Sequence, residues 1–500
     1  MEPRGDREGR RGALRAWSGR AAWLLAGALA AVATVYVLRA RALPDLETWH
    51  RLRLEQELGG ERAGEVHDLE GLLALEERLF AELAGRQREL AGAPPFSRFR
   101  AESPTRSANH PRDWNRTRWL EPAGAPRGAA LLLHGLSDSP YSLRAVGEAL
   151  AAEGIAVLAL RLPGHGTLPG ALTGTGVDAW REAVRVGTAA VAERAAGRPW
   201  AIVGYSNGAA LALDHALAAL EGRGEPPAAL PDRLVFLSPA FAVTPLAGLA
   251  RWQERAARLP GLEKLGWTDV LPEYDPYKYN SFPLHAAAEI HRLTAEVEAA
   301  LARLARAGRL GELPPTLALQ SVVDATVPPT ASLARVFGRL PGNGSELVLF
   351  DLNRRAAALG FLAARVDALL ADARRIGSLA FAVTLVTNSG EGSDVEARTW
   401  AAHATAPQVE PLGLAWPPGL YSLSHVAIPF PPDDPIYGAG PGDGTFPIGS
   451  LEPRGERGAL AVPLDLLMRL RYNPFHAYLE RRVLRFLRLA EPPPALEPGA

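Results

Sequence analysis

The chain has 500 residues, enough for one large domain with additions or for two domains. Lys and Arg number 54 against 55 Asp and Glu, so the sequence lacks the basic excess typical of nucleic-acid-binding proteins. No cysteine is present, which excludes disulfide bonds, thiolate catalysis and cysteine-bound zinc or iron–sulfur clusters. Hydrophobic residues make up 47% and charged residues 22%, a composition typical of a chain that buries a core.

The first feature along the chain is an uncharged run at residues 21–38, 18 residues long. A helix of this length is just long enough to span the hydrocarbon core of a bilayer. Six arginines precede it, against three acidic residues, which predicts that residues 1–20 form a cytoplasmic basic tail. We therefore predict an uncleaved, single-pass signal anchor in the inner membrane, with the main domain of the chain in the periplasm. A cleaved signal peptide and a core helix are the alternatives.

Residues 44–92 follow, rich in charge and with leucines at helical spacing. This pattern predicts a helical membrane-proximal segment, ended by Pro94 and Pro95. Residues 93–490 are predicted to form one large domain, and residues 491–500 a disordered tail that contains three consecutive prolines.

From about residue 127, short apolar runs alternate with helical patterns, which indicates a parallel sheet with right-handed crossovers. The strand-like runs are 129–133, 155–160, 200–203, 234–237, 317–323 and 346–350, and the helical patterns are 142–152, 177–195 and 206–220. The alternation breaks at about 240–313, which we interpret as an inserted cap. It breaks again at about 352–418, a second insertion with an amphipathic helix at 359–373 and a strand-like run at 381–386. A closing helix is expected at 474–489.

The motif that carries chemistry is the pentapeptide at residues 204–208, which has the form G-x-S-x-G. It follows an apolar strand and precedes a helix, the context in which this motif forms a nucleophile turn. A serine in so sharp a turn is strained, and Gly204 and Gly208 leave the necessary room. The hydroxyl of Ser206 would then stand at a helix N-terminus, where the helix dipole favours developing negative charge.

Two further loops support this interpretation. An apolar strand runs into His134-Gly135, where the backbone N–H of Leu136, together with that of Asn207, would form an oxyanion hole. His134 itself is interpreted as loop-shaping. A tight Gly-rich turn at residues 162–167 contains His165, which precedes the nucleophile in the chain and is interpreted as structural.

With these motifs, the chain resembles α/β-hydrolases of the monoacylglycerol-lipase and bacterial carboxylesterase group, the serine-aminopeptidase-like superfamily. His134-Gly135, the LPGHGT run at 162–167 and the pentapeptide at 204–208 carry the resemblance, which covers about residues 127–340 and the closing helix. It implies an α/β-hydrolase fold with a mostly parallel central sheet, here with an inserted cap and the N-terminal transmembrane helix. It does not cover residues 1–90 or the second insertion.

The resemblance implies the chain order nucleophile, acid, histidine. Asp324 follows a strand-like run after the cap and is the expected acid, with Asp351 as the alternative. His425, in a polar loop before a Pro-rich stretch, is the expected histidine, with His403 as the alternative. Asp324 and His425 are 101 residues apart, where the family usually needs a few tens, so the second insertion must lie between them.

The sequence therefore predicts a serine hydrolase that cleaves carboxylic esters, of esterase or lipase type, through a Ser206-His425-Asp324 triad and an acyl-enzyme. No metal or organic cofactor is expected, and no nucleic-acid partner. The expected partners are a small-molecule or lipid ester substrate and the membrane. Peptide or amide hydrolysis and a non-catalytic binding module of the same fold are the alternatives.

Overall fold

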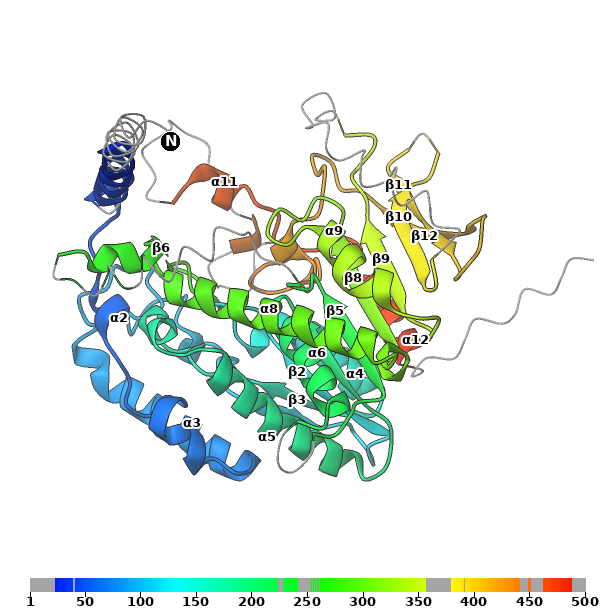
Figure 1. Cartoon of the computed structure of the whole chain (residues 1–500), viewed down its shortest axis with the longest axis horizontal. Helices are drawn as coiled ribbons and strands as arrows, with labels where there is room; N and C mark the ends of the chain where they lie inside the picture. The colour runs from blue at the N-terminus through cyan, green and yellow to red at the C-terminus, as the bar shows by residue number, and fades with distance from the viewer. Residues whose placement is uncertain are drawn as a thin grey trace, which may run out of the picture.

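A computed structural model describes residues 23–38, 41–223, 228–241, 261–356, 379–390, 392–440, 448–450 and 462–487, with residues 253, 255, 257 and 259. Its centre is one ten-stranded sheet in the order β1-β3-β2-β4-β5-β8-β9-β10-β11-β12 (Figure 1). The sheet strands are β1 Arg118–Leu120, β2 Gly128–Leu133, β3 Ile155–Leu160, β4 Trp200–Tyr205, β5 Arg233–Leu237, β8 Thr316–Ser321, β9 Glu346–Phe350, β10 Ala382–Asn388, β11 Asp394–Trp400 and β12 Gln408–Ala415.

The sheet is mostly parallel, as the sequence predicts. Every pair from β3 to β10 is parallel, whereas β1 pairs antiparallel with β3, and β11 pairs antiparallel with both β10 and β12. The helices of the described residues are α2 Thr48–Arg51, α3 Leu69–Gly85, α4 Arg144–Ala152, α5 Val177–Ala195, α6 Asn207–Leu220, α8 Leu284–Arg306, α9 Pro329–Ala331, α11 Leu464–Leu467 and α12 His476–Phe486, besides residues 23–38.

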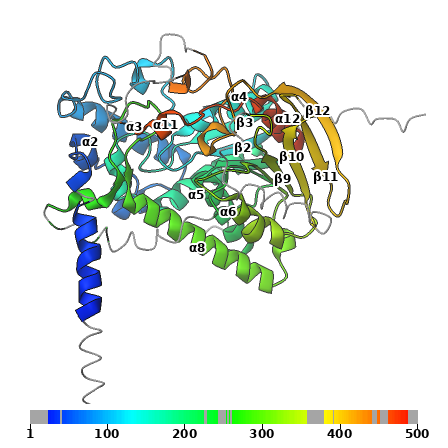
Figure 2. The same ribbon diagram turned by 90° about the horizontal axis from the view of Figure 1, so that it is seen from above.

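Both faces of the sheet are covered by helices, which explains why its central strands are apolar throughout. Alternate side chains of β2 enter two separate cores: Leu131 and Leu133 pack with α5, α6 and α8, whereas Ala130 and Leu132 pack with α4 and α12. This alternation is the two-residue period of a strand. Figures 1 and 2 show the same layers, with the long helix α8 crossing one side of the molecule.

The segment at residues 44–92 packs against the body of the protein. Helix α3 is capped at its N-terminus by Asp68, whose carboxylate accepts a hydrogen bond from the N–H of Gly71, 2.8 Å away. Its buried Leu72 and Leu75 belong to the same hydrophobic core as the strands, together with Leu58. The predicted membrane-proximal helix therefore packs against α5 on the outside of the protein body (Figure 1).

The two predicted insertions have different structures. In the cap region, the described residues form a short hairpin, β6 Trp267–Asp269 and β7 Phe282–Pro283, followed by α8. The second insertion extends the central sheet at its edge through β10, β11 and β12 (Figure 2). Its predicted helix at 359–373 lies outside the described residues, as do the tails at 1–20 and 491–500.

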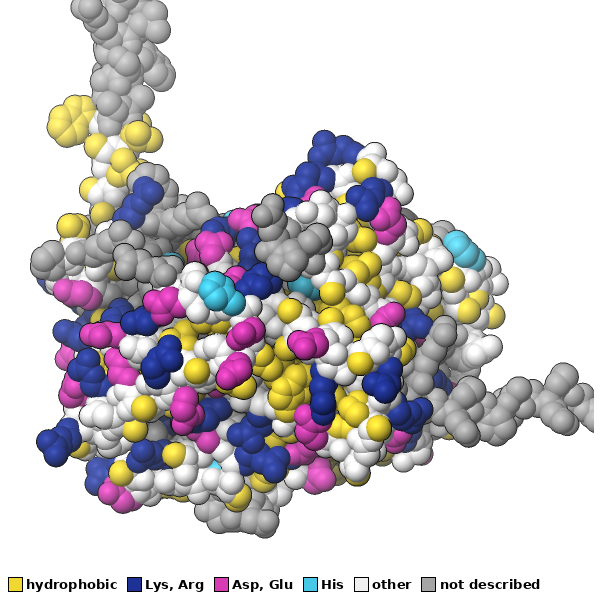
Figure 3. Space-filling view, turned by 90° about the horizontal axis from the view of Figure 1, so that it is seen from below, with side chains coloured by type: hydrophobic (Ala, Val, Ile, Leu, Met, Phe, Trp, Pro, Cys, Tyr) yellow, Lys and Arg dark blue, Asp and Glu magenta, His cyan; other side chains and the backbone are white. Residues whose placement is uncertain are grey.

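Residues 23–38 form a helix that extends away from the body in Figure 2, and its apolar side chains are exposed, Trp23 at 81%. Residues 21 and 22 of the predicted span lie outside the described residues. No helix of the described part is both long enough and apolar enough to cross a membrane. On the body, the face in Figure 3 mixes basic and acidic side chains, in keeping with the formal net charge of −1.

Candidate active site

Ser206 sits at the C-terminal end of β4, between the strand and the first residue of α6, where the sequence predicts it. Its backbone has φ 52° and ψ −112°, a conformation that non-glycine residues rarely adopt. The turn is fixed by hydrogen bonds from the N–H of Ser206 to the carbonyl of Leu237, at 2.9 Å, and from the N–H of Ala240 to the carbonyl of Ser206, at 3.1 Å. The turn is therefore held by the neighbouring strand β5 and by the loop that follows it.

The flanking glycines are required by close backbone contacts. A Cβ on Gly208 would lie 1.9 Å from the carbonyl oxygen of Leu133, at the end of β2. A Cβ on Gly204 would lie 2.5 Å from the backbone of Ala209. Helix α6 thus begins against two strand ends, and this brings Ser206 beside the loop that follows β2.

Leu136 and Asn207 present backbone N–H groups at this junction. Neither N–H donates a hydrogen bond to a carbonyl of the described chain. Asn207 is the first residue of α6, so its N–H has no partner within the helix. Two unused donors, one in the loop after β2 and one directly after Ser206, are what an oxyanion hole needs.

His425 and Asp324 are brought together although 101 residues separate them in the chain. His425 Nδ1 lies 2.7 Å from Asp324 Oδ2, and both side chains are buried. The other carboxylate oxygen of Asp324 accepts the N–H groups of Thr326 and Val327, at 2.9 and 2.8 Å. The carboxylate is an acceptor in all three contacts, which leaves Nε2 of His425 as the free nitrogen of the neutral ring.

His425 also lies beside the nucleophile turn. Its ring centroid is 5.4 Å from that of Tyr205, the residue before Ser206. Within the described residues, Ser206 keeps 9% of its surface exposed and its hydroxyl has no hydrogen-bond partner. In structures without substrate, the contact between nucleophile and base is often long and tightens on binding.

The second insertion returns the chain to the site. Leu420 and Tyr421 follow β12, and both contact Asn353, which lies just beyond β9. The N–H of Asn353 donates to the carbonyl of Tyr421 at 2.9 Å, and its side-chain amide donates to the carbonyl of Leu420, also at 2.9 Å. These bonds fix the returning chain four residues before His425. The insertion thus adds strands at the sheet edge without displacing the histidine loop.

The alternative residues have other roles. Asp351 is buried and bound by the guanidinium of Arg354, at 2.9 Å, and by the hydroxyl of Thr387, at 2.8 Å. His403 is exposed in the turn between β11 and β12, far along the added edge of the sheet. Neither residue contacts the nucleophile turn.

His134 and His165 are buried, neutral supports. His134 Nε2 accepts the N–H of Leu162 at 2.9 Å while Nδ1 donates to the carbonyl of Gly135, also at 2.9 Å. This ring joins the oxyanion loop to the Gly-rich turn. The ring of His165 lies edge-on to His134, 4.9 Å away. Burial lowers the pKa of His134 and lowers that of His165 to about 3, so neither ring is suited to act as a base near neutral pH.

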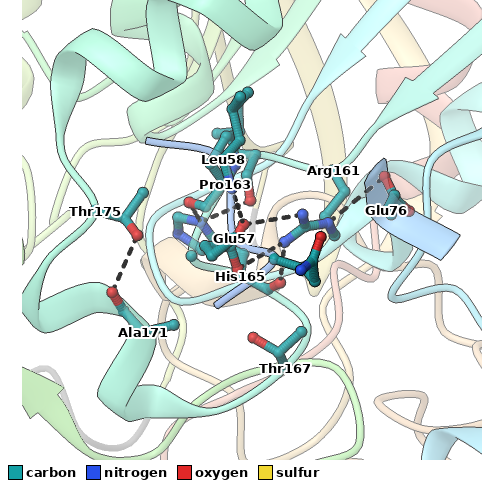
Figure 4. Close-up of polar contacts among 12 residues, drawn as sticks. Glu57, Leu58, Glu76, Arg161, Pro163, His165, Thr167, Ala171 and Thr175 are labelled. Carbon is teal, nitrogen blue, oxygen red and sulfur yellow. Dashed lines mark hydrogen bonds and ion pairs between the residues drawn. The ribbon is translucent and has the colours of Figure 1, made fainter. Parts of the chain in front are cut away.

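Sequence reasoning missed the buried charge cluster beneath this turn (Figure 4). Arg161 is 3% exposed, and its guanidinium lies 3.0 Å from Glu57 and 3.6 Å from Glu76. It also donates to the carbonyl of His165 at 2.9 Å. Both carboxylates come from the N-terminal segment, which therefore holds the turn that supports His134.

A second missed contact joins the cap to the oxyanion loop. Lys278 Nζ forms an ion pair with the Asp138 carboxylate at 2.8 Å, and the N–H of Tyr279 donates to the carbonyl of Ser137, also at 2.8 Å. The side chain of Lys278 is 27% exposed, whereas Asp138 is buried. No signal in the sequence links these residues across the intervening strands.

Apolar side chains gather beside the Ser206 turn. Ala240, Ile290 and Val327 form a small buried cluster against which Leu136 packs. The N–H of Ala240 donates a hydrogen bond to the carbonyl of Ser206, and the N–H of Val327 donates one to the Asp324 carboxylate. The cluster therefore adjoins both residues. Within the described residues, no group of three or more His, Asp or Glu side chains is placed to hold a metal ion.

Residues 124–352 match the family model of Hydrolase_4, described as serine aminopeptidase, S33. This region has the α/β-hydrolase fold. The matched residues include Ser206 and Asp324 and end before His425, at the start of the second insertion. The sheet order and the position of Ser206 in the turn after β4 agree with this fold and with the predicted resemblance.

Solved structures of hydrolases are also similar to the chain. The metagenome-derived lipolytic enzymes LipS and LipT give a structure 19% identical, covering 52% of this chain and 98% of that one, with a TM-score of 0.37. A monoacylglycerol lipase of Paleococcus ferrophilus is 21% identical over 47% and 88%, with a TM-score of 0.35. A carboxyl esterase of Bacillus coagulans is 17% identical over 47% and 84%, with a TM-score of 0.33. A comparison with curated proteins finds no match.

Proposed function

We propose that the chain is a serine hydrolase that cleaves carboxylic esters through Ser206, His425 and Asp324. The observation that carries the proposal is the buried pair of His425 and Asp324, 2.7 Å apart, beside the strained turn of Ser206. A neutral imidazole fixed at Nδ1 by a carboxylate leaves Nε2 to accept a proton, which is the arrangement that activates a serine.

The reaction follows from this placement. Nε2 of His425 takes the proton of Ser206 Oγ as the oxygen attacks the acyl carbonyl. The N–H groups of Leu136 and Asn207 stabilise the oxyanion, each contributing about 3 kcal/mol of barrier lowering. His425 then gives its proton to the leaving alcohol, and a water activated by the same nitrogen releases the acid from the acyl-enzyme. Asp324 stabilises the imidazolium in both steps.

The apolar cluster beside the Ser206 turn favours an ester with an apolar acyl group. Leu136, Ile290 and Val327 offer no hydrogen-bonding side chain to a substrate, so a carbon chain would contact them without desolvating a polar group. The expected substrate is accordingly a small-molecule or lipid ester, of the kind cleaved by esterases or lipases.

A second candidate, peptide or amide hydrolysis, is favoured by the serine aminopeptidase description of the matching family. Labelling with a fluorophosphonate tests the shared mechanism: the full chain should be modified at Ser206, and Ser206→Ala should stay unlabelled. A panel of esters of graded chain length, run beside peptide amides, then separates the two substrate classes. No labelling and no turnover of either class would instead support a non-catalytic binding module.

The N-terminal helix suggests where the enzyme works. We propose that residues 21–38 anchor the chain in the inner membrane with the hydrolase in the periplasm. The arginine-rich stretch before the run and the exposure of Trp23 and Leu24, at 81% and 76%, support this. A C-terminal alkaline-phosphatase fusion should be active and sediment with membranes. An inactive fusion would place the domain in the cytoplasm, and recovery in the soluble fraction would indicate a cleaved signal.

A further inference from the structure

A small cavity of about 140 Å³ lies between the N-terminal segment and the Gly-rich turn, outside the candidate active site. One wall is helix α3 with Phe80, another is the chain around Arg98 and Phe99, and Gly166 and Thr167 close the side toward the sheet. Thr167 is labelled in Figure 4, near the buried cluster of Arg161. Neither the family match, which begins at residue 124, nor the proposed mechanism gives this cavity a role.

Arg98 is the feature that makes the cavity unusual. It is 6% exposed, yet no carboxylate of the described residues lies within 4 Å of its guanidinium. Nη1 donates to the carbonyl of Lys278 at 3.2 Å, and the guanidinium carbon lies 5.3 Å from the ring centre of Tyr279. Nε and Nη2 have no hydrogen-bond partner in the described part of the chain. The charge of Arg98 acts on the buried carboxyl group of Glu273, which does not line the cavity and forms no ion pair with the arginine. Burying a permanent charge without a directly paired counter-charge is costly, so Arg98 in the lining marks a place for an anion.

Two more arginines line the same cavity. Arg106 is half-buried and, within the described residues, forms no ion pair. Arg116 is paired with Glu77 and lies 3.6 Å from Asp113, the one carboxylate among the described residues that line the cavity. Because Arg116 is compensated by Glu77 and Asp113, the net positive charge of the lining comes from Arg98 and Arg106. Guanidinium forks bind carboxylates and phosphates with two parallel hydrogen bonds.

Most of the remaining lining is apolar, and its aromatic side chains are held in place. Phe80 and Phe99 contribute aromatic surface, together with leucines of the N-terminal segment. The amide of Gln87 donates to the carbonyl of Phe99 at 2.8 Å, and Trp49 stacks on the Phe99 ring with centroids 5.3 Å apart. A cavity of about 150 Å³ is large enough for benzene. A ligand would find these walls formed beforehand, which reduces the entropy lost on binding.

We propose that this cavity is a binding site for a small organic carboxylate, one carboxyl group on a single ring or a few carbons. The carboxylate pairs with Arg98 and Arg106, and the apolar part rests against Phe80 and Phe99. The site is separate from Ser206 and does not depend on the proposed hydrolysis.

Titration calorimetry of the full chain with benzoate tests the proposal. We expect saturable binding with a Kd of about 1 mM or tighter. Benzamide, of the same shape without the charge, should bind at least tenfold more weakly, and so should inorganic phosphate, which has no apolar part. Equal binding of benzamide would overturn the carboxylate assignment, and tighter binding of phosphate would indicate an inorganic anion site instead.

Variants locate the site. Arg106→Gln, which removes a charge that has no partner in the described structure, should weaken benzoate binding about tenfold, and Arg98→Gln should weaken it further. Asp113→Asn removes the opposing carboxylate and should strengthen binding several-fold. The control is Arg88→Gln, an exposed arginine of the same segment that does not line the cavity. If Arg106→Gln and Arg88→Gln bind benzoate alike, the cavity is not the site, whether or not Arg98→Gln folds.

Discussion

Replacement of Arg161 by leucine tests how the N-terminal segment and the hydrolase sheet are held together. The guanidinium, 3% exposed, lies between Glu57 and Glu76, whose side chains are 10% and 4% exposed. Glu76 also accepts the N–H of Thr117, at 2.6 Å. Arg161→Leu therefore leaves two carboxylates facing each other in a largely dry environment.

The magnitude follows from that burial. Breaking a buried pair by removing one partner costs about 3–5 kcal/mol, because the remaining charge is uncompensated. Burial already raises the pKa of Glu76, and Arg161 opposes that rise, so loss of the arginine raises the pKa further. The variant should therefore lose more stability at pH 8 than at pH 5, where its carboxyl groups can take up protons.

The assay is urea unfolding followed by tryptophan fluorescence. Arg194→Leu is the matched control, because Arg194 pairs with Glu121 at 2.6 Å while both side chains are nearly half exposed, and such a pair contributes about 0–1 kcal/mol. Adding Glu57→Gln and Glu76→Gln to Arg161→Leu should restore part of the loss, since removing all charges of a buried cluster is often close to neutral. A midpoint for Arg161→Leu equal to that of Arg194→Leu would refute this reasoning.

Three further outcomes are expected. Asp324→Asn should lower the kcat for ester hydrolysis about 10⁴-fold while the unfolding midpoint stays unchanged; a small loss of activity would remove Asp324 from the triad. Gly208→Ala should fail to accumulate as folded protein, because its Cβ would lie 1.9 Å from the Leu133 carbonyl, whereas Gly174→Ala, with no atom within 4 Å, should fold normally. The pKa of His165 falls to about 3 on folding from 6.5, so the unfolded chain binds a proton that the native chain does not. Stability should therefore decline below about pH 6.5, by up to about 2 kcal/mol at pH 5 from this ring, and unfolding midpoints of His165→Gln should show a shallower decline; an equal decline would exclude the ring as its source.

The central strands could be predicted from the sequence because helices cover both faces of the sheet. In that environment every side chain of a strand is buried, and the strand appears as a continuous apolar run such as 129–133. The Ser206 turn could be predicted because the steric need at Gly204 and Gly208 leaves a local signature. Both signals involve residues that are adjacent in the chain.

Strands β11 and β12 escaped prediction for the opposite reason. They lie at the edge of the sheet, where β12 is mostly exposed and contains Pro411 within its length. An edge strand needs no continuous apolar run, and proline is tolerated there because one side has no partner. The single strand predicted in this insertion, at 381–386, corresponds to β10, the innermost of the three.

The contacts of Arg161 show a limit of another kind. Its partner Glu57 is 104 residues away, and each residue alone resembles an ordinary solvated charge. The family match begins at residue 124, yet the cluster places carboxylates from before that boundary beneath the turn that supports the oxyanion loop. Leu58, Leu72 and Leu75 bury their side chains in the same core as the strands. The folding unit that positions the candidate site therefore extends beyond the family-matched residues and includes the N-terminal segment, so a fragment cut at residue 124 would lose both the apolar cover of α5 and the counter-charges of Arg161.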